Sequence, residues 1–183
     1  MKNAFTKSMG LAALAVMLLT LFGQMAVSAQ DRVMELVPEL RNNDASAAQS
    51  EPRDEYRKIE GSWNNVTTRR NCVTGAATGT FPSMFTFSQG GTMWEAGAGA
   101  DPKLRGASHG VWRLESNGVY VTAVQFFRFN ADGTPAGRQI IRQVIELSPD
   151  WTTYTATAAV QVLDVNGNVI ANNCATGVGT RFD

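Results

Sequence analysis

From residue 58 onward the chain alternates short apolar runs with polar turns and shows no sustained helical period. Runs rich in β-branched and aromatic residues, bounded by turn residues, are typical of β-strands. The first run follows Gly61. Seven more follow it and read SMFTF, TMWEA, GVWRLE, VYVTAVQFFRF, RQIIRQVIEL, TTYTATAAVQVL and NVIANNCATGVGTRF. The pattern therefore predicts eight strands and excludes architectures that alternate helices with strands.

The segments between these runs carry the residues of tight turns. Asn-Gly and Asp-Gly pairs favour the positive φ angles that tight hairpins need. The turn sequences are SQGG at 88–91, ESNG at 115–118, NADG at 130–133, SPD at 148–150 and VNGN at 165–168. One long connection, 97–109, separates the third and fourth predicted strands. Short strands joined by tight turns indicate an antiparallel sandwich or barrel.

Two residue pairs indicate that the first and last strands meet. The numbers of facing residues in an antiparallel pair add to a constant, and Trp63 with Arg181 gives 244 while Cys72 with Cys174 gives 246. Because side chains alternate between faces, one register places the Trp–Arg pair on one face and both cysteines on the other. Closure removes both free edges of the sheet. We predict an all-β fold, an eight-stranded antiparallel up-and-down β-barrel.

The beginning of the chain has the features of an export signal. Lys2 and Lys7 precede an apolar run at 11–22, and the small residues of Val27-Ser28-Ala29 fit a cleavage site. We predict a signal peptide at 1–29, cleavage near Ala29 and Gln30, and a secreted or periplasmic protein. The run is too short to span a bilayer comfortably, so no stable membrane insertion is expected after cleavage. We predict a barrel domain at 58–183.

Residues 30–57 are expected to form a largely disordered linker with one short helix near its start. The segment RNNDASAAQSEPRDE is small, polar and charged, and such a composition buries too little apolar area to offset its ordering entropy. After the predicted cleavage, 14 basic and 16 acidic residues remain. This balance argues against a nucleic acid or an anionic membrane surface as partner. It does not indicate an oligomeric state.

The few cysteines and histidines limit which metal sites and catalytic groups the chain can form. The two cysteines, Cys72 and Cys174, are most simply a disulfide in an oxidising compartment. His109 is the single histidine, and no metal-ligand spacing is present. We therefore assign no metal, no cofactor and no catalytic residue from the sequence.

The residues Gly61-x-Trp63, together with Arg181 near the end of the last strand, resemble the lipocalin and wider calycin superfamily. The resemblance covers 58–183, and the family's central Thr-Asp-Tyr motif has no good match. It implies that Trp63 plugs one end of the barrel and that Arg181 packs over it. It also implies a compact lipocalin-like barrel of the bacterial, exported type.

Strand alternation predicts which side chains face the lumen. Counting from Trp63 places Asn65, Thr67 and Arg69 inside. Trp94 is expected inside with Glu95 outside, whereas on 119–129 both faces are apolar and the inward face stays open. The last two strands contribute mainly Ala and Gly, which is expected to leave room for a guest. The expected ligand-binding residues are Arg69, Phe85, Phe87, Trp94, Trp112, Gln143 and Tyr154.

The sequence leaves three hypotheses for the function open. The first is binding of a small, mostly apolar molecule in the lumen, since apolar walls with few polar groups are typical of ligand pockets. The second is a cyclase or isomerase that uses His109 or Arg69, although adjacent Ser108 and His109 point apart on an extended chain. The third is a ligand-free interaction module with a filled core and an exposed apolar patch near Met93 or 97–109.

Overall fold

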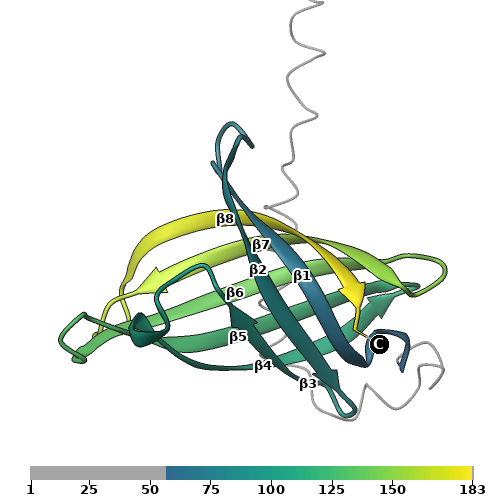
Figure 1. The fold of residues 1–183 in the computed structure, drawn as a ribbon, viewed down its shortest axis with the longest axis horizontal. Coiled ribbons are helices and arrows are strands. Elements are labelled where there is room, and N and C mark those ends of the chain that lie inside the picture. The colour runs from purple at the N-terminus through teal and green to yellow at the C-terminus, as the bar shows by residue number, and fades with distance from the viewer. Residues whose placement is uncertain (1–56, 183) are drawn as a thin grey trace, which may run out of the picture.

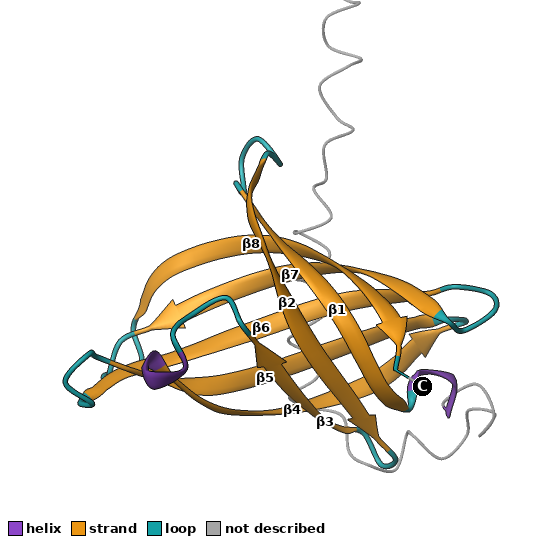
Figure 2. Ribbon diagram, viewed as in Figure 1, coloured by secondary structure: helices purple, strands orange, loops and turns teal. Residues whose placement is uncertain are grey.

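The computed structural model describes residues 57–182, which form a closed antiparallel barrel (Figures 1 and 2). Two 3-10 turns, η3 (Arg57–Ile59) and η4 (Pro102–Leu104), precede β1 and β4. The strands are β1 (Gly61–Arg70), β2 (Ala77–Ser88), β3 (Thr92–Gly97), β4 (Arg105–Ser116), β5 (Val119–Phe129), β6 (Pro135–Leu147), β7 (Thr153–Leu163) and β8 (Val169–Arg181). Each strand pairs with the next and β8 pairs with β1, so the predicted fold is confirmed.

Two of the predicted segments fall outside this description. The predicted signal peptide at 1–29 lies outside the described residues, as does the predicted linker at 30–57 except for its last residue. Within 57–182, no helix is long and apolar enough to cross a membrane.

The predicted turns carry glycine where the backbone requires it. Gly118, Gly133 and Gly167 have φ angles of 71°, 82° and 87°, a region in which residues with a Cβ are disfavoured. The turn after β5 is further held by Asp132, which accepts hydrogen bonds from the Thr134 hydroxyl at 2.6 Å and the Thr134 backbone N–H at 2.9 Å. These two bonds hold the pKa of Asp132 below its ordinary value.

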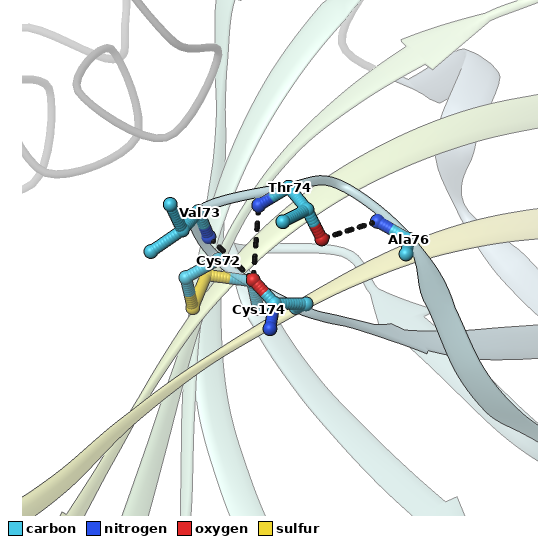
Figure 3. Close-up of a disulfide and its surroundings, with 6 residues drawn as sticks. Cys72, Val73, Thr74, Ala76 and Cys174 are labelled. Atoms are coloured by element: carbon cyan, nitrogen blue, oxygen red, sulfur yellow. Dashed lines mark hydrogen bonds between the residues drawn. A yellow bond between two sulfur atoms is a disulfide. The ribbon is translucent and has the colours of Figure 1, made fainter.

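β1 and β8 close the barrel in the predicted register. The facing pairs run from Trp63 opposite Arg181 to Arg70 opposite Cys174, and every pair adds to 244. Cys72 lies beyond the end of β1, in the β1–β2 turn (Figure 3). The predicted disulfide is therefore confirmed, with a Cα–Cα distance of 5.3 Å. The expectation that the cysteines face each other on neighbouring strands is wrong, because Cys72 reaches back to β8 from the turn.

The turn that carries Cys72 has its own hydrogen-bonded frame. The Asn71 side-chain oxygen accepts from the backbone N–H groups of Val73 and Thr74 at 2.8 and 2.9 Å. The Ala76 N–H in turn donates to the Thr74 hydroxyl at 3.3 Å (Figure 3). Asparagine is well suited to this role because its short amide can bond the backbone two or three residues on. The turn thus presents Cys72 to β8 in a fixed position.

Strand alternation gives the predicted inner face on most strands but not on β3. Met93 and Glu95 are buried on the inner face, whereas Trp94 lies outside and is 46% exposed, so the predicted orientation of β3 is wrong. On β5 the face left open by the sequence is settled, since Tyr120 and Val124 are buried while Phe127 is exposed. The predicted connection at 97–109 is also shorter than expected, because β4 begins at Arg105.

β3 is joined to β4 by a short ladder. Only Thr92 opposite Val111 and Met93 opposite Gly110 pair in register along β3 and β4. Beyond these pairs, the Ser108 hydroxyl replaces the backbone–backbone hydrogen bonds at Glu95. It accepts from the Glu95 N–H at 2.8 Å and donates to the Glu95 carbonyl. One side chain thus satisfies two backbone groups that a paired strand would otherwise bond.

Candidate functional site

One half of the barrel interior is a close-packed aromatic core. The rings of Trp63 and Tyr154 lie 5.1 Å apart between centroids, and Trp112 lies 5.9 Å from Tyr120 and 6.2 Å from Phe87. Aromatic pairs at these separations add to the energy of burial itself. The predicted ligand-binding residues Phe85, Phe87, Trp112 and Tyr154 all belong to this core. Their positions are those of structural residues that fill and close one end.

The Gly-x-Trp motif and the C-terminal arginine close that end together. Trp63 is fully buried, and its indole N–H donates to the Ile59 carbonyl of η3 at 2.8 Å. The Arg181 guanidinium lies 4.4 Å from the Trp63 ring centroid and donates to backbone carbonyls in and just after η3. Gly61 has a φ of +114°, and a Cβ there would lie 3.2 Å from Arg181 Nη1. Glycine is therefore required where the chain passes under the arginine.

The two glycines near the end of β8 do not leave the room that the sequence predicts. A Cβ added at Gly179 would lie 2.2 Å from the ring of Tyr154, and one at Gly177 would lie 2.9 Å from Asn65 Oδ1. Side chains from β7 and β1 therefore occupy the space over the two glycines. This is complementary packing of large against small residues, as expected for a filled interior.

Two buried polar atoms in this region have no hydrogen-bond partner within residues 57–182. They are the Tyr154 hydroxyl and Asn65 Oδ1, and their residues are 2% and 4% exposed. The Asn65 amide nitrogen is fixed by bonds to Thr67 and Ser83 at 2.9 and 2.8 Å. Its oxygen is therefore left to face the interior above Gly177. An unsatisfied buried group is costly unless a water or a ligand completes it.

Replacing Tyr154 with phenylalanine is expected to leave stability unchanged at pH 8 or to raise it by about 1 kcal/mol, because a buried hydroxyl without a partner is removed. Burial also raises the pKa of Tyr154. The unfolded chain ionises this phenol above its ordinary pKa of about 10, whereas the folded protein keeps it neutral. The wild type therefore loses stability above about pH 10 and the variant loses less.

Urea unfolding of both proteins at pH 8 and pH 11 measures this effect. We expect the variant's advantage to grow between the two pH values. A wild type that is the more stable protein at both would show that the hydroxyl has a partner in solution.

The other half of the interior is reached by solvent. Ile141 faces inward between Val124 and Val160, yet it is only partly buried. Thr67 and Gln139 also have the inward orientation and are likewise partly exposed. Most inward-facing residues in the aromatic half, by contrast, are almost completely buried, although Leu147 is only partly so. The barrel is thus closed at the Trp63 end and accessible at the other.

Gln143 lies inside, as predicted, and is 7% exposed. It pairs across the sheet with Thr122, whose hydroxyl donates to the Gln143 side-chain oxygen at 3.1 Å. Thr122 was not singled out in the sequence because both faces of β5 are apolar. The bond fixes the orientation of the glutamine amide.

A buried ion pair that the sequence analysis missed lies in the interior of the accessible half. Arg105 donates to both carboxylate oxygens of Glu95 and to the Gly97 carbonyl. The guanidinium also lies 3.9 Å from the centroid of the Phe126 ring. The side chains of the pair are only 12% and 4% exposed. The sequence does not indicate this pair, because strand alternation predicts Glu95 on the outer face and Arg105 lies in the segment predicted to be a loop.

Arg69 lies at the rim of the accessible half. It has the inward orientation but is exposed, and it donates to the Gly99 carbonyl in the β3–β4 connection. Its guanidinium lies 4.7 Å from the centroid of the Phe81 ring. This predicted ligand-binding residue therefore holds a loop against the barrel mouth.

Trp94, the remaining predicted ligand-binding residue, lines a groove on the outer surface. The groove has a volume of about 430 Å³, within the range of sites for small molecules. It crosses the outer faces of β1, β2 and β3 and extends to the first part of β4 and the end of β8. Its lining includes Ser62, Met84, Thr86, Trp94, Ala96 and Phe182. Neither Met84 nor Phe182 was identified from the sequence, because single exposed apolar residues are common on surfaces.

The sequence candidates for nucleophilic catalysis do not converge. Ser108 is buried and its hydroxyl is engaged with the backbone of Glu95, whereas His109 is exposed on the outer face of β4. The two side chains point to opposite faces, as predicted for adjacent residues of a strand. Within 57–182, no group of three or more His, Cys, Asp or Glu side chains is placed to hold a metal ion.

Comparison with known protein families and with curated proteins finds no match to this chain. The chain is therefore defined by its architecture, a closed eight-stranded antiparallel barrel with a disulfide.

Proposed function

We propose that this protein is an exported, lipocalin-like barrel that binds a small, mostly apolar molecule in the accessible half of its lumen. One observation carries the proposal: Ile141 faces the interior, packs against the edge of the aromatic core and is still partly exposed. Beside it lie the apolar side chains of Val124 and Val160, and Ala158 and Ala175 belong to the same inner face. Apolar walls with a few fixed polar groups are the usual make-up of a ligand site.

Fixed polar groups on the inner face also support the proposal. Gln143 presents an amide whose orientation is set by Thr122. The Glu95–Arg105 pair neutralises its own charge, so the site suits a neutral guest better than an ion.

Native mass spectrometry of the protein purified from its own host tests the proposal. We expect a defined mass excess of one small molecule per chain. Ala175→Phe, which adds a ring at an inward position near the mouth, should abolish the excess. Ala96→Phe makes the same change on the outer surface and should retain it.

A fluorescence titration with N-phenyl-1-naphthylamine, a neutral apolar probe, gives a second readout on ligand-free protein. Saturable binding that is lost in Ala175→Phe and kept in Trp94→Ala places the probe in the lumen. Equal binding to Ala175→Phe and wild type would overturn the lumen site.

A further inference from the structure

The outer surface of the barrel is divided into a charged and an uncharged side. Along β7, β8, β1, β2 and β3, Arg70 at the end of β1 is the single outward-facing charged residue. β4 and β6 by contrast carry most of the outward charges, Arg113, Glu115, Arg138, Arg142 and Glu146. Most of a protein surface carries charges of both signs, so five neighbouring strands with one charge form an unusual face.

The uncharged face is organised around two aromatic side chains with hydroxyl groups between them. Ser62 on β1 pairs with Thr86 on β2, and Thr86 pairs with Trp94 on β3. On the other side, the backbone N–H of Phe182 donates to the Ser62 carbonyl at 2.9 Å. The order across four strands is therefore Phe182, Ser62, Thr86, Trp94. At the usual strand spacing the two aromatic residues are about 14 Å apart.

The groove of about 430 Å³ follows this row. Met84, which is 60% exposed, contributes to its lining. The Ser62 and Thr86 hydroxyls lie 3.2 Å apart and each keeps further hydrogen-bonding capacity. Two neutral hydroxyls thus lie between two aromatic side chains along one exposed groove.

Threonines extend the same surface chemistry away from the groove. Thr157, Thr176, Thr68 and Thr80 form one cross-strand row over β7, β8, β1 and β2. Thr153 and Thr180 begin a second row that continues through Asn64 to Met84. Apart from Met84, these rows present neutral donors and acceptors at the lateral spacing of the strands, about 4.8 Å. The exposed side chains of Val66 and Val178 lie between the two rows.

The shape and composition of the uncharged face indicate which class of partner can bind it. An acidic partner would find only Arg70, which already donates to the Thr176 hydroxyl, and a basic partner would find no opposite charge. A second copy of this chain would set one convex barrel wall against another (Figure 2), which restricts contact to a strip, whereas a stable interface buries about 800 Å² on each side. A narrow, neutral, hydroxyl-rich chain fits both the groove and the curvature. Its hydroxyls match the threonines and serine, and its C–H faces pack on the negative faces of aromatic rings.

We propose that the outer face of β8–β1–β2–β3 binds a neutral polysaccharide chain, seated between Trp94 and Phe182 over Ser62 and Thr86. This site is separate from the lumen and independent of any guest there.

Affinity electrophoresis of the full chain in native gels tests the proposal. Laminarin, xyloglucan, galactomannan and dextran serve as neutral probes, and alginate serves as a charged one. We expect slower migration in at least one neutral gel and none in alginate. In the same gel, Trp94→Ala and Phe182→Ala should each weaken binding at least about tenfold.

Two exposed aromatic residues outside the groove provide matched controls. Trp151 is 46% exposed, as is Trp94, and Phe127 is 68% exposed against 62% for Phe182. Trp151→Ala and Phe127→Ala should migrate as the wild type does.

Normal migration of the wild type in all neutral gels overturns the proposal, as does retardation that survives both groove variants. Sedimentation velocity supplies the remaining test. A dimer that dissociates in Trp94→Ala would show that a second copy occupies this face, and it too would overturn the proposal.

Discussion

Replacing Trp63 with alanine is expected to lower the free energy of unfolding by about 3–5 kcal/mol, the usual cost of removing a buried large aromatic side chain. Trp63 is fully buried against Tyr154 and beneath the Arg181 guanidinium. The substitution leaves a cavity at the closed end of the barrel. It also leaves the Ile59 carbonyl without its indole partner. Urea unfolding followed by circular dichroism measures the loss.

Trp151→Ala is the matched control, because it removes the same side chain from a loop where it is half-exposed. We expect it to change stability by less than about 1 kcal/mol. Trp63→Phe keeps most of the buried ring but loses the hydrogen bond, so it should fall between the two. Equal stability of Trp63→Ala and the wild type would mean that the closed end does not depend on this residue.

Removing the disulfide by the double change Cys72→Ser and Cys174→Ser is expected to lower the free energy of unfolding by about 4–5 kcal/mol. The bridge joins residues 102 positions apart, and the loop-entropy relation gives this value for a loop of about 100 residues. The effect is large because the cross-link ties the first strand to the last and so restricts the unfolded chain across most of the barrel.

Reduction of the wild type gives an independent measure of the same effect. Wild type with reductant should unfold at the same urea concentration as the double serine variant, whereas the variant itself should not respond to reductant. A reduced wild type as stable as the oxidised one would contradict the entropic account. The refolding rate should also fall on reduction, because the β1–β8 pairing is a long-range contact.

Closure of the barrel could be predicted from spacing alone because antiparallel pairing imposes a constant sum on residue numbers. The Trp63–Arg181 pair has the predicted register. The cysteine pair departs from it by two because Cys72 belongs to the turn, and a turn residue is not bound by the strand register. The two-residue discrepancy in the sequence was thus a sign that one cysteine had left the strand.

The orientation of β3 could not be predicted because its two faces look alike in sequence. Each face of TMWEAG carries one large apolar residue, Met93 or Trp94. The more apolar appearance of Trp94 favoured the wrong face, since burying Glu95 looks costly. That cost is offset by Arg105, which meets Glu95 only once β3 and β4 are folded together. The orientation of β3 is therefore set by its contacts with β4, and the pattern of residues within β3 alone does not predict it.

The capacity of the lumen could not be predicted from the sequence for a related reason. Glycines and alanines on β8 indicate space only if the neighbouring strands leave it empty. Tyr154 and Asn65 fill the space above Gly179 and Gly177, so the aromatic half is packed and access is confined to the opposite half. Side-chain packing between strands is a property of the assembled barrel, and sequence alternation supplies only the list of residues that face inward.

The short ladder between β3 and β4 has a consequence for how the barrel fluctuates. Where other neighbouring strands share long ladders, this seam has two register pairs. Beyond them it is joined by side chains, the Ser108 hydroxyl on the Glu95 backbone and Arg105 on the Glu95 carboxylate and the Gly97 carbonyl. Local opening begins where the fewest backbone bonds must break. β3 and β4 should therefore separate transiently at this seam. Such an opening would give the interior a lateral passage in addition to the mouth of the barrel.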